Sequence, residues 1–111
     1  MKIRINGGEA AADVQLADTF LTRFLGLMGR RSLPEDGGLL LKDCGSIHTC
    51  FMRFPIDVIY LSADYRVLDA QTVRPWRMGT LVRGAKHTLE LNAGKKEMFH
   101  AGDILTLCQE G

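Results

Sequence analysis

The chain has 111 residues, 46% hydrophobic and 24% charged, with a formal net charge of +1. This length supports one domain over residues 1–111 and excludes two independent cores. The near-neutral charge gives no reason to expect nucleic-acid binding, and the absence of any run of about 18 apolar residues predicts no membrane span. Three cysteines, an odd number, favour reduced thiols. We therefore expect a cytoplasmic protein by default, or an exported, periplasmic one if a leader was removed.

The N-terminal quarter predicts two strands and one helix. Residues Lys2–Ile5 alternate between polar and apolar, which is typical of a strand, and an Asn-Gly turn follows. A second strand is expected from Ala12 to Ala17, with Val14 and Leu16 pointing inward. Apolar residues then recur at helical spacing between residues 18 and 29, which predicts a short helix that contributes to the core.

The central stretch from Cys44 to Leu61 gathers most of the chemically capable side chains. It follows a strand at Leu39–Leu41 that is expected to be buried on both faces. Alternation within the central stretch predicts two strands, separated at residues 53–55 because proline lacks a ladder donor. In the first strand His48 would share a face with Cys50 and Met52. In the second strand Asp57, which follows Ile56, would share a face with two apolar residues.

The C-terminal half predicts three more strands. They are expected at Tyr65–Val73, Thr88–Leu91 and Ile104–Cys108, and the segment from Arg74 to Lys86 is irregular and basic. Many short strands with a single helix indicate a mainly β fold. We expect a compact antiparallel sandwich or barrel, with its one short helix near residues 18–29.

Cysteine and histidine chemistry is the first functional possibility. Cys44, His48 and Cys50 are soft metal ligands, but zinc sites usually need a second ligand pair and the sequence offers none at matching spacing. No metal and no cofactor are therefore expected. A Cys50 thiolate with His48 as its base would need an oxyanion hole, and no nucleophile-elbow motif accompanies the pair. The sequence therefore favours a protein that is not an enzyme.

Asp57 and the basic segment are the second possibility. Asp57 stands between apolar residues, so its carboxylate would be costly to bury without hydrogen bonds. It is either a structural carboxylate or a ligand contact. The segment from Arg74 to Lys86 carries four basic residues and no acid, and it includes Trp76 beside Arg77. Planar guanidiniums beside an indole can hold an anion or a carbohydrate-like ligand.

The chain resembles a family of small prokaryotic proteins, domain-of-unknown-function family 192 (DUF192), in its branch with an Ile-His-Thr-x-Phe-Met motif. The resemblance extends from about Ala12 to Leu107 and rests on six motifs: Arg23-Phe24-Leu25-Gly26-Leu27-Met28, Ser46-Ile47-His48-Thr49-Cys50-Phe51-Met52, Pro55-Ile56-Asp57-Val58, Pro75-Trp76-Arg77, Leu89-Glu90-Leu91-Asn92-Ala93-Gly94 and Gly102-Asp103. The resemblance implies a mainly β fold with a short helix and implies no activity. Many relatives carry export leaders, which implies that this protein could also be exported.

Three functional hypotheses remain open. The first is a binding module for a small polar or anionic ligand or a protein segment, with the ligand held by His48, Thr49, Met52, Asp57, Trp76 and Arg77. The second is a hydrolase-like enzyme with His48 and Asp57 as acid and base. The third is an export- or assembly-associated adaptor, which would show an exposed apolar patch. No oligomeric state is predicted.

Overall fold

The computed structural model of the chain describes residues 1–19, 22, 27–28, 30 and 32–109. The helix predicted at residues 18–29 lies mostly outside these described residues. The described elements, in chain order, are β1 (Lys2–Ile5), β2 (Gly8–Ala11), β3 (Asp13–Ala17), β4 (Gly37–Leu41), β5 (Ile56–Leu61), β6 (Val67–Val73), β7 (His87–Asn92), the 3₁₀ helix η1 (Lys95–Met98) and β8 (Leu105–Cys108).

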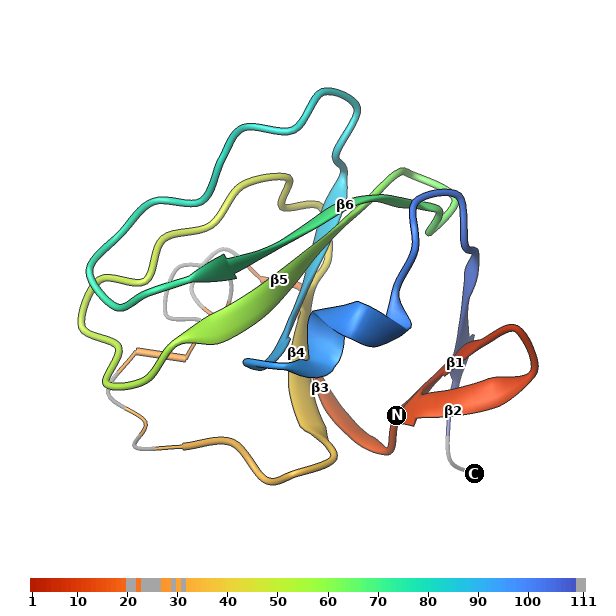
Figure 1. The fold of residues 1–111 in the computed structure, drawn as a ribbon, viewed down its shortest axis with the longest axis horizontal. Coiled ribbons are helices and arrows are strands. Elements are labelled where there is room, and N and C mark those ends of the chain that lie inside the picture. The colour runs from red at the N-terminus through yellow and green to blue at the C-terminus, as the bar shows by residue number, and fades with distance from the viewer. Residues whose placement is uncertain (20–21, 23–26, 29, 31, 110–111) are drawn as a thin grey trace.

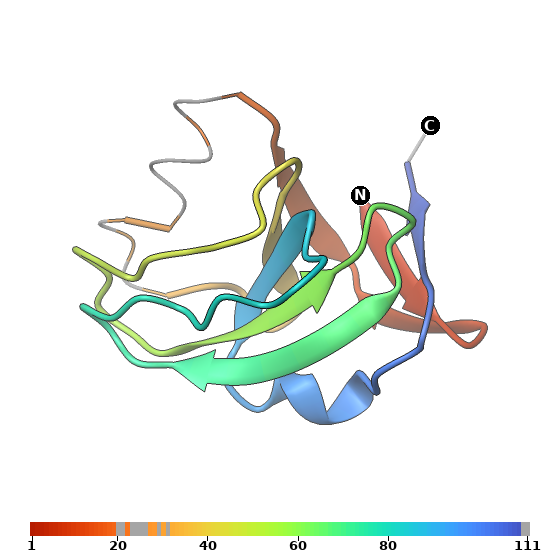
Figure 2. The same cartoon turned by 90° about the horizontal axis from the view of Figure 1, so that it is seen from above.

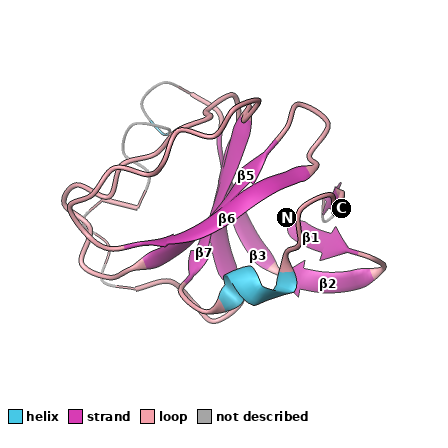
Figure 3. Cartoon of the chain, turned by 45° about the horizontal axis from the view of Figure 1, so that its top comes forward, coloured by secondary structure: helices cyan, strands magenta, loops and turns pink. Residues whose placement is uncertain are grey.

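The strands form two sheets, as expected for a sandwich (Figure 1). The large sheet has the order β3-β4-β7-β5-β6, and the small sheet has the order β2-β1-β8. Every pair is antiparallel except β3 with β4, which is parallel. Both termini lie beside the small sheet, and η1 lies between the two sheets at one end (Figure 3). The mainly β prediction is therefore confirmed.

Alternation along the strands divides the core into two apolar clusters, one on each face of the large sheet. The first fills the space between the sheets and includes Ile3 and Leu105 from the small sheet with Ile59 and Leu89 from the large one. The second lies on the opposite face of the large sheet and is covered by loops rather than by strands. Because both faces are covered, β5 is buried along its whole length.

Only one of the two strands predicted in the central stretch is present in the structure. Its second part is β5, which begins directly after Pro55 as predicted. The first part is not a strand, because the chain turns at Cys50 and Phe51, and Phe51 adopts a φ of 63°. A residue in the left-handed region cannot continue a strand. His48 and Cys50 are consequently half-buried while Met52 is fully buried, so these three do not share one face.

Two further differences arise near the N-terminus. Strand β2 was not predicted, because Gly-Glu-Ala-Ala has low strand propensity and is held by its pairing with β1. Leu16 was expected to point inward, yet it is 40% exposed. It lies on β3, which is the edge strand of the sheet within the described residues and pairs there with β4. Val14 and Ala17 supply the buried side chains of this strand instead.

Candidate functional site

Two loops cover the second apolar cluster and run side by side. We call residues 44–55 the His48 loop and residues 74–86 the Trp76 loop; they are the yellow-green and teal segments in Figures 1 and 2. Backbone bonds join them where Thr49 N donates to Arg77 O at 2.7 Å and Trp76 N donates to Thr49 O at 2.8 Å. The two loops therefore form one connected layer.

Thr49 joins the two loops through its side chain as well. The residue is fully buried, and its hydroxyl lies 2.5 Å from Arg74 O and 3.0 Å from Arg77 O. The same hydroxyl accepts a hydrogen bond from Arg77 N at 2.7 Å. One buried hydroxyl thus satisfies polar backbone groups at both ends of the tight turn from Arg74 to Arg77.

Replacing Thr49 with Val is expected to lower the free energy of unfolding by about 1–3 kcal/mol. Valine keeps the shape but leaves Arg77 N–H and Arg74 C=O without this buried partner. Urea denaturation measures the loss. Thr106→Val, an exposed substitution on β8, is the matched control and should change stability by less than about 0.5 kcal/mol. Equal stability of the two variants would contradict this role for Thr49.

Phe51 and Trp76 form an exposed aromatic pair where the two loops meet. Their ring centroids are 4.6 Å apart with an interplanar angle of 58°. The rings touch one another, yet Phe51 is 57% exposed and Trp76 is 55% exposed. Both residues have a left-handed backbone, with φ of 63° and 62°. This conformation costs an L-residue about 1–2 kcal/mol, so the pair opposes folding without burying much surface in return.

A hollow of about 260 Å³ lies between the edge of β6 and the Trp76 loop. It is lined by Gln71, Thr72, Val73, Arg74, Arg77, Met78 and Thr80. Among the described residues that line it, two are arginines and none is acidic. The arrangement favours a negatively charged occupant, because no protein carboxylate in the lining neutralises the arginines.

The wall of this hollow is held by a network of hydrogen bonds around the side chain of Gln71. Gln71 Oε1 accepts from the Tyr60 hydroxyl at 2.5 Å and from Thr80 N at 2.8 Å, and Gln71 Nε2 donates to Thr80 Oγ1 at 2.8 Å. Burial raises the pKa of Tyr60 to about 12, with Asp69 and Glu90 adding to the effect. The phenol thus stays protonated and remains a donor. The Trp76 loop is fixed to the sheet edge without any ligand.

His48 lies beside this site, and Met52 lies beneath it. His48 forms a bridge with Met78, and its Nδ1 accepts a hydrogen bond from Cys50 N at 3.2 Å. Met52 is 3% exposed and belongs to the apolar cluster under the loops. Met52 therefore supports the loop layer from below.

Asp57 lies on the other face of the large sheet. It is fully buried and accepts hydrogen bonds from the Thr72 hydroxyl at 2.6 Å and from the backbone N–H groups of Gly94 and Lys96, both at 2.8 Å. The two backbone donors belong to the bend between β7 and η1, so this bend supplies the hydrogen bonds that a buried carboxylate needs.

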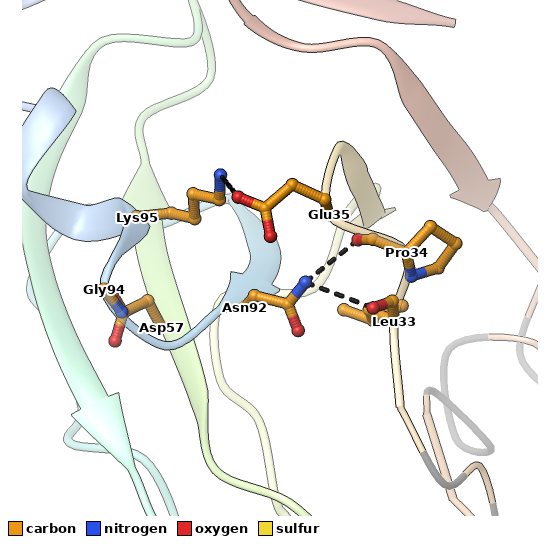
Figure 4. Close-up of polar contacts among 7 residues, drawn as sticks. All are labelled: Leu33, Pro34, Glu35, Asp57, Asn92, Gly94 and Lys95. Carbon is orange, nitrogen blue, oxygen red and sulfur yellow. Dashed lines mark hydrogen bonds and ion pairs between the residues drawn. The ribbon is translucent and has the colours of Figure 1, made fainter.

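The same bend is tied to the loop before β4 (Figure 4). Asn92 Nδ2 donates to Leu33 O at 3.2 Å and to Pro34 O at 2.9 Å, and Lys95 Nζ lies 2.8 Å from Glu35 Oε1. Together with Asp57 these contacts hold three segments that are distant in sequence. The motif from Asn92 to Lys95 is therefore a structural junction.

The structure thus brings together His48, Thr49, Trp76 and Arg77, and it separates Met52 and Asp57 from them. Sequence reasoning missed Phe51, Met78 and the polar β6 residues that line the hollow. Phe51 stands in a stretch whose alternation predicts a strand, and Met78 stands in a segment without periodicity. Two apolar side chains of this loop, Met78 and Leu81, are more than 70% exposed, and no local sequence pattern indicates their exposure.

The structure also shows the state of the cysteines and of the possible metal ligands. Cys44, Cys50 and Cys108 are free, half-buried thiols. Among residues 1–19, 22, 27–28, 30 and 32–109, no group of three or more His, Cys, Asp or Glu side chains is placed to hold a metal ion. In the same residues no helix is long and apolar enough to cross a membrane.

Comparison with known proteins identifies the family. The sequence model of DUF192, described as "Uncharacterized ACR", matches residues 1–106. The chain belongs to the DUF192 family. A UPF0127 protein of Pyrococcus furiosus is 38% identical over 91 residues, which cover 76% of this chain and 75% of that protein. The family resemblance expected from the sequence motifs is confirmed.

Solved structures share the fold of this DUF192 chain. A protein of unknown function from Novosphingobium aromaticivorans aligns with a TM-score of 0.80 and 21% identity, over 96% of this chain and 84% of the other. A Sinorhizobium meliloti protein named as a candidate transcription regulator aligns with a TM-score of 0.77 and 24% identity, over 95% of this chain and 91% of the other. At these identities the likeness shows the fold alone.

Proposed function

We propose that this DUF192 domain is a binding module for a small anionic ligand, held in the hollow beside β6. The proposal rests on one observation: Arg74 and Arg77 both line the hollow, and no acidic residue is present among the described residues of its lining. Guanidinium groups bind carboxylate and phosphate oxygens through paired, charge-assisted hydrogen bonds. The hollow, about 260 Å³ in volume, suits a small molecule or one side chain of a larger partner.

The edge of β6 adds further donors to this site. Ala70 N donates to the side chain of its own neighbour Asp69, at 2.8 Å, so the backbone of Ala70 faces the open edge. Backbone groups two residues apart in a strand point the same way, so the N–H of Thr72 faces this edge too. Thr72 lines the hollow. An anion between Thr72 and the arginines would therefore meet neutral as well as charged donors.

The geometry gives less support to catalysis by His48 and Asp57. The Asp57 carboxylate is buried and already accepts from Thr72, Gly94 and Lys96. A general base must reach a proton on the substrate, and these three donors occupy its oxygens on the sheet face opposite the loops. The acid/base alternative stays a hypothesis without a specific supporting contact.

Fluorescence titration with inorganic phosphate and with sulfate tests the proposal. Trp76 is the only tryptophan in the chain and stands between the two arginines in sequence, so its emission reports on this loop. We expect saturable binding in the wild type. Arg77→Gln should weaken it by about 10- to 100-fold, because hydrogen bonds to charged groups contribute about 1.5–3 kcal/mol each.

Arg83→Gln is the matched control for this titration. Arg83 lies on the same loop and is exposed, but it does not line the hollow. Its substitution removes the same charge and should change the affinity by less than about threefold, as expected for a distant, screened charge. Equal weakening by both substitutions would indicate general charge attraction and would contradict a site in the hollow.

A further inference from the structure

We infer that the ligand of this site carries a planar ring next to its anionic group, and that the ring stacks on the Phe51–Trp76 pair. This inference rests on the proposed function, because it assigns the anionic group to Arg74 and Arg77. The ligand class is a ring-bearing phosphate or carboxylate, such as an aryl phosphate, a nucleoside monophosphate or an aryl carboxylate. The ring is the part that adds affinity beyond that of a bare anion.

The first support is the unusual state of the aromatic pair. Phe51 and Trp76 each adopt a left-handed backbone and each keep more than half of their surface in water. Burial in the protein's own core therefore does not explain why these residues hold a strained conformation. A large, rigid aromatic surface that is presented to solvent in this way is typical of a surface that receives another ring.

The second support is the rigidity of the turn that presents Trp76. Trp76 N donates to Thr49 O at 2.8 Å, and Arg77 N donates to Thr49 Oγ1 at 2.7 Å. Both bonds end on one fully buried residue of the neighbouring loop. The backbone that carries the indole and the guanidinium is thus fixed before any ligand arrives, so binding would require little ordering of the backbone.

The third support is the proximity of the two halves of the site. Arg77 lines the hollow and follows Trp76 directly in the chain, so their Cα atoms are about 3.8 Å apart. Arg77 Nη1 donates to Trp76 O at 3.2 Å, which holds the guanidinium close to the turn. A ligand whose ring is joined to its phosphate or carboxylate by a short linker would therefore meet both groups at once.

Calorimetric titration with inorganic phosphate, phenyl phosphate, adenosine monophosphate, acetate and phenylacetate tests this inference. Phenyl phosphate should bind at least about tenfold more tightly than inorganic phosphate, because stacking of its ring on an aromatic side chain adds to the binding free energy. Adenosine monophosphate should show the same advantage if the site takes a nucleotide. An advantage confined to phenylacetate over acetate would assign the ligand to the carboxylates.

Trp76→Gly removes the ring while glycine accepts a φ of 62° without strain, so the turn should persist. This variant should lose the advantage of phenyl phosphate and keep its affinity for inorganic phosphate within about threefold. Leu81→Ala, which shortens an exposed apolar residue of the same loop outside the hollow, should lose neither. Circular dichroism verifies the fold of each variant.

The outcomes separate the inference from the proposed function. Binding of inorganic phosphate without any advantage for the ring-bearing ligands would overturn the stacking inference and leave the anion site standing. An advantage that survives in Trp76→Gly would also overturn stacking on this pair. No binding of any of the five ligands would overturn both.

Discussion

Replacing Glu90 with Gln is expected to stabilise this protein above pH 8 by roughly 3–5 kcal/mol while changing its stability little below pH 4.5. Glu90 lies on β7, the central strand of the large sheet, and is 2% exposed. Its neighbours in the register are Leu39 on β4 and Val58 on β5. The carboxyl group therefore stands in the middle of the apolar face that the two loops cover.

Burial governs the protonation of this group. Its Oε2 atom has no hydrogen-bond partner among the described residues, and the same holds for the nearby hydroxyl of Thr88. Desolvation raises the pKa of Glu90 from 4.5 to about 8, and the charge of Arg30 opposes the rise only partly. The folded protein thus keeps the proton at a pH where the unfolded chain has released it.

The direction of the pH dependence follows from these two pKa values. Below pH 4.5 both states hold the proton, so the contribution of neutral Glu90 to stability is complete. Between pH 4.5 and about 8 the folded state binds more protons than the unfolded state, so the free energy of unfolding falls as the pH rises. The loss is about 1.4 kcal/mol for each pH unit in this window. Glutamine keeps the shape and carries no charge at any pH.

Urea denaturation of the wild type and Glu90→Gln between pH 4 and 9 measures this effect. The difference in free energy of unfolding between the two proteins should grow with pH and level off above about pH 8. Glu97→Gln, an exposed substitution on η1, is the matched control and should show no such growth. A difference between wild type and Glu90→Gln that stays constant with pH would show that Glu90 is ionised in the folded state.

Replacing Asp57 with Asn is expected to cost about 2–4 kcal/mol of stability at neutral pH. The carboxylate accepts three hydrogen bonds in a fully buried position, two of them from backbone N–H groups of the β7–η1 bend to a single oxygen, Oδ2. An amide in its place either turns its NH₂ group toward these N–H donors or turns it toward the hydroxyl of Thr72. Either orientation weakens a charge-assisted bond or leaves a buried donor without a partner.

Thermal and urea denaturation of Asp57→Asn measure this loss. Asp69→Asn on β6 is the matched control, because Asp69 is exposed and its Oδ1 can still accept from Ala70 as an amide oxygen. We expect the control to change stability by less than about 1 kcal/mol. A stable Asp57→Asn variant with altered ligand binding would contradict the structural role of Asp57 and would favour the ligand contact that the sequence left open.

Strand positions could be predicted well where alternation and turn residues agreed. The limits of β1 were predicted without error, and β5 begins after the proline that removes a ladder donor. The alternation of polar and apolar residues gave a wrong strand prediction where a turn interrupts the chain. The His48 loop has the pattern of a strand, but its backbone turns at Phe51 and gives its hydrogen bonds to the Trp76 loop, which no local pattern encodes.

The site could be predicted in part for a similar reason. Trp76 and Arg77 stood out because basic and aromatic residues cluster in a segment without acids, and this clustering is local in sequence. The hollow needs β6 as its second wall, and that contact depends on Gln71 bonding to Thr80 across the loop. Glu90 was overlooked because its alternation with leucines is typical of a half-exposed strand, whereas β7 is covered on both faces.

Mapping of backbone and arginine side-chain NMR signals during titration with phenyl phosphate tests the central claim most directly. We predict that the largest shifts fall on the Nε–H groups of Arg74 and Arg77, on the amides of Thr72 and Thr80, and on the indole of Trp76. A second hollow, of about 330 Å³, is lined by Val67, Lys96 and Phe99 among others, and provides an internal comparison. Shifts concentrated there, or spread over all exposed cations, would contradict a binding site between β6 and the Trp76 loop.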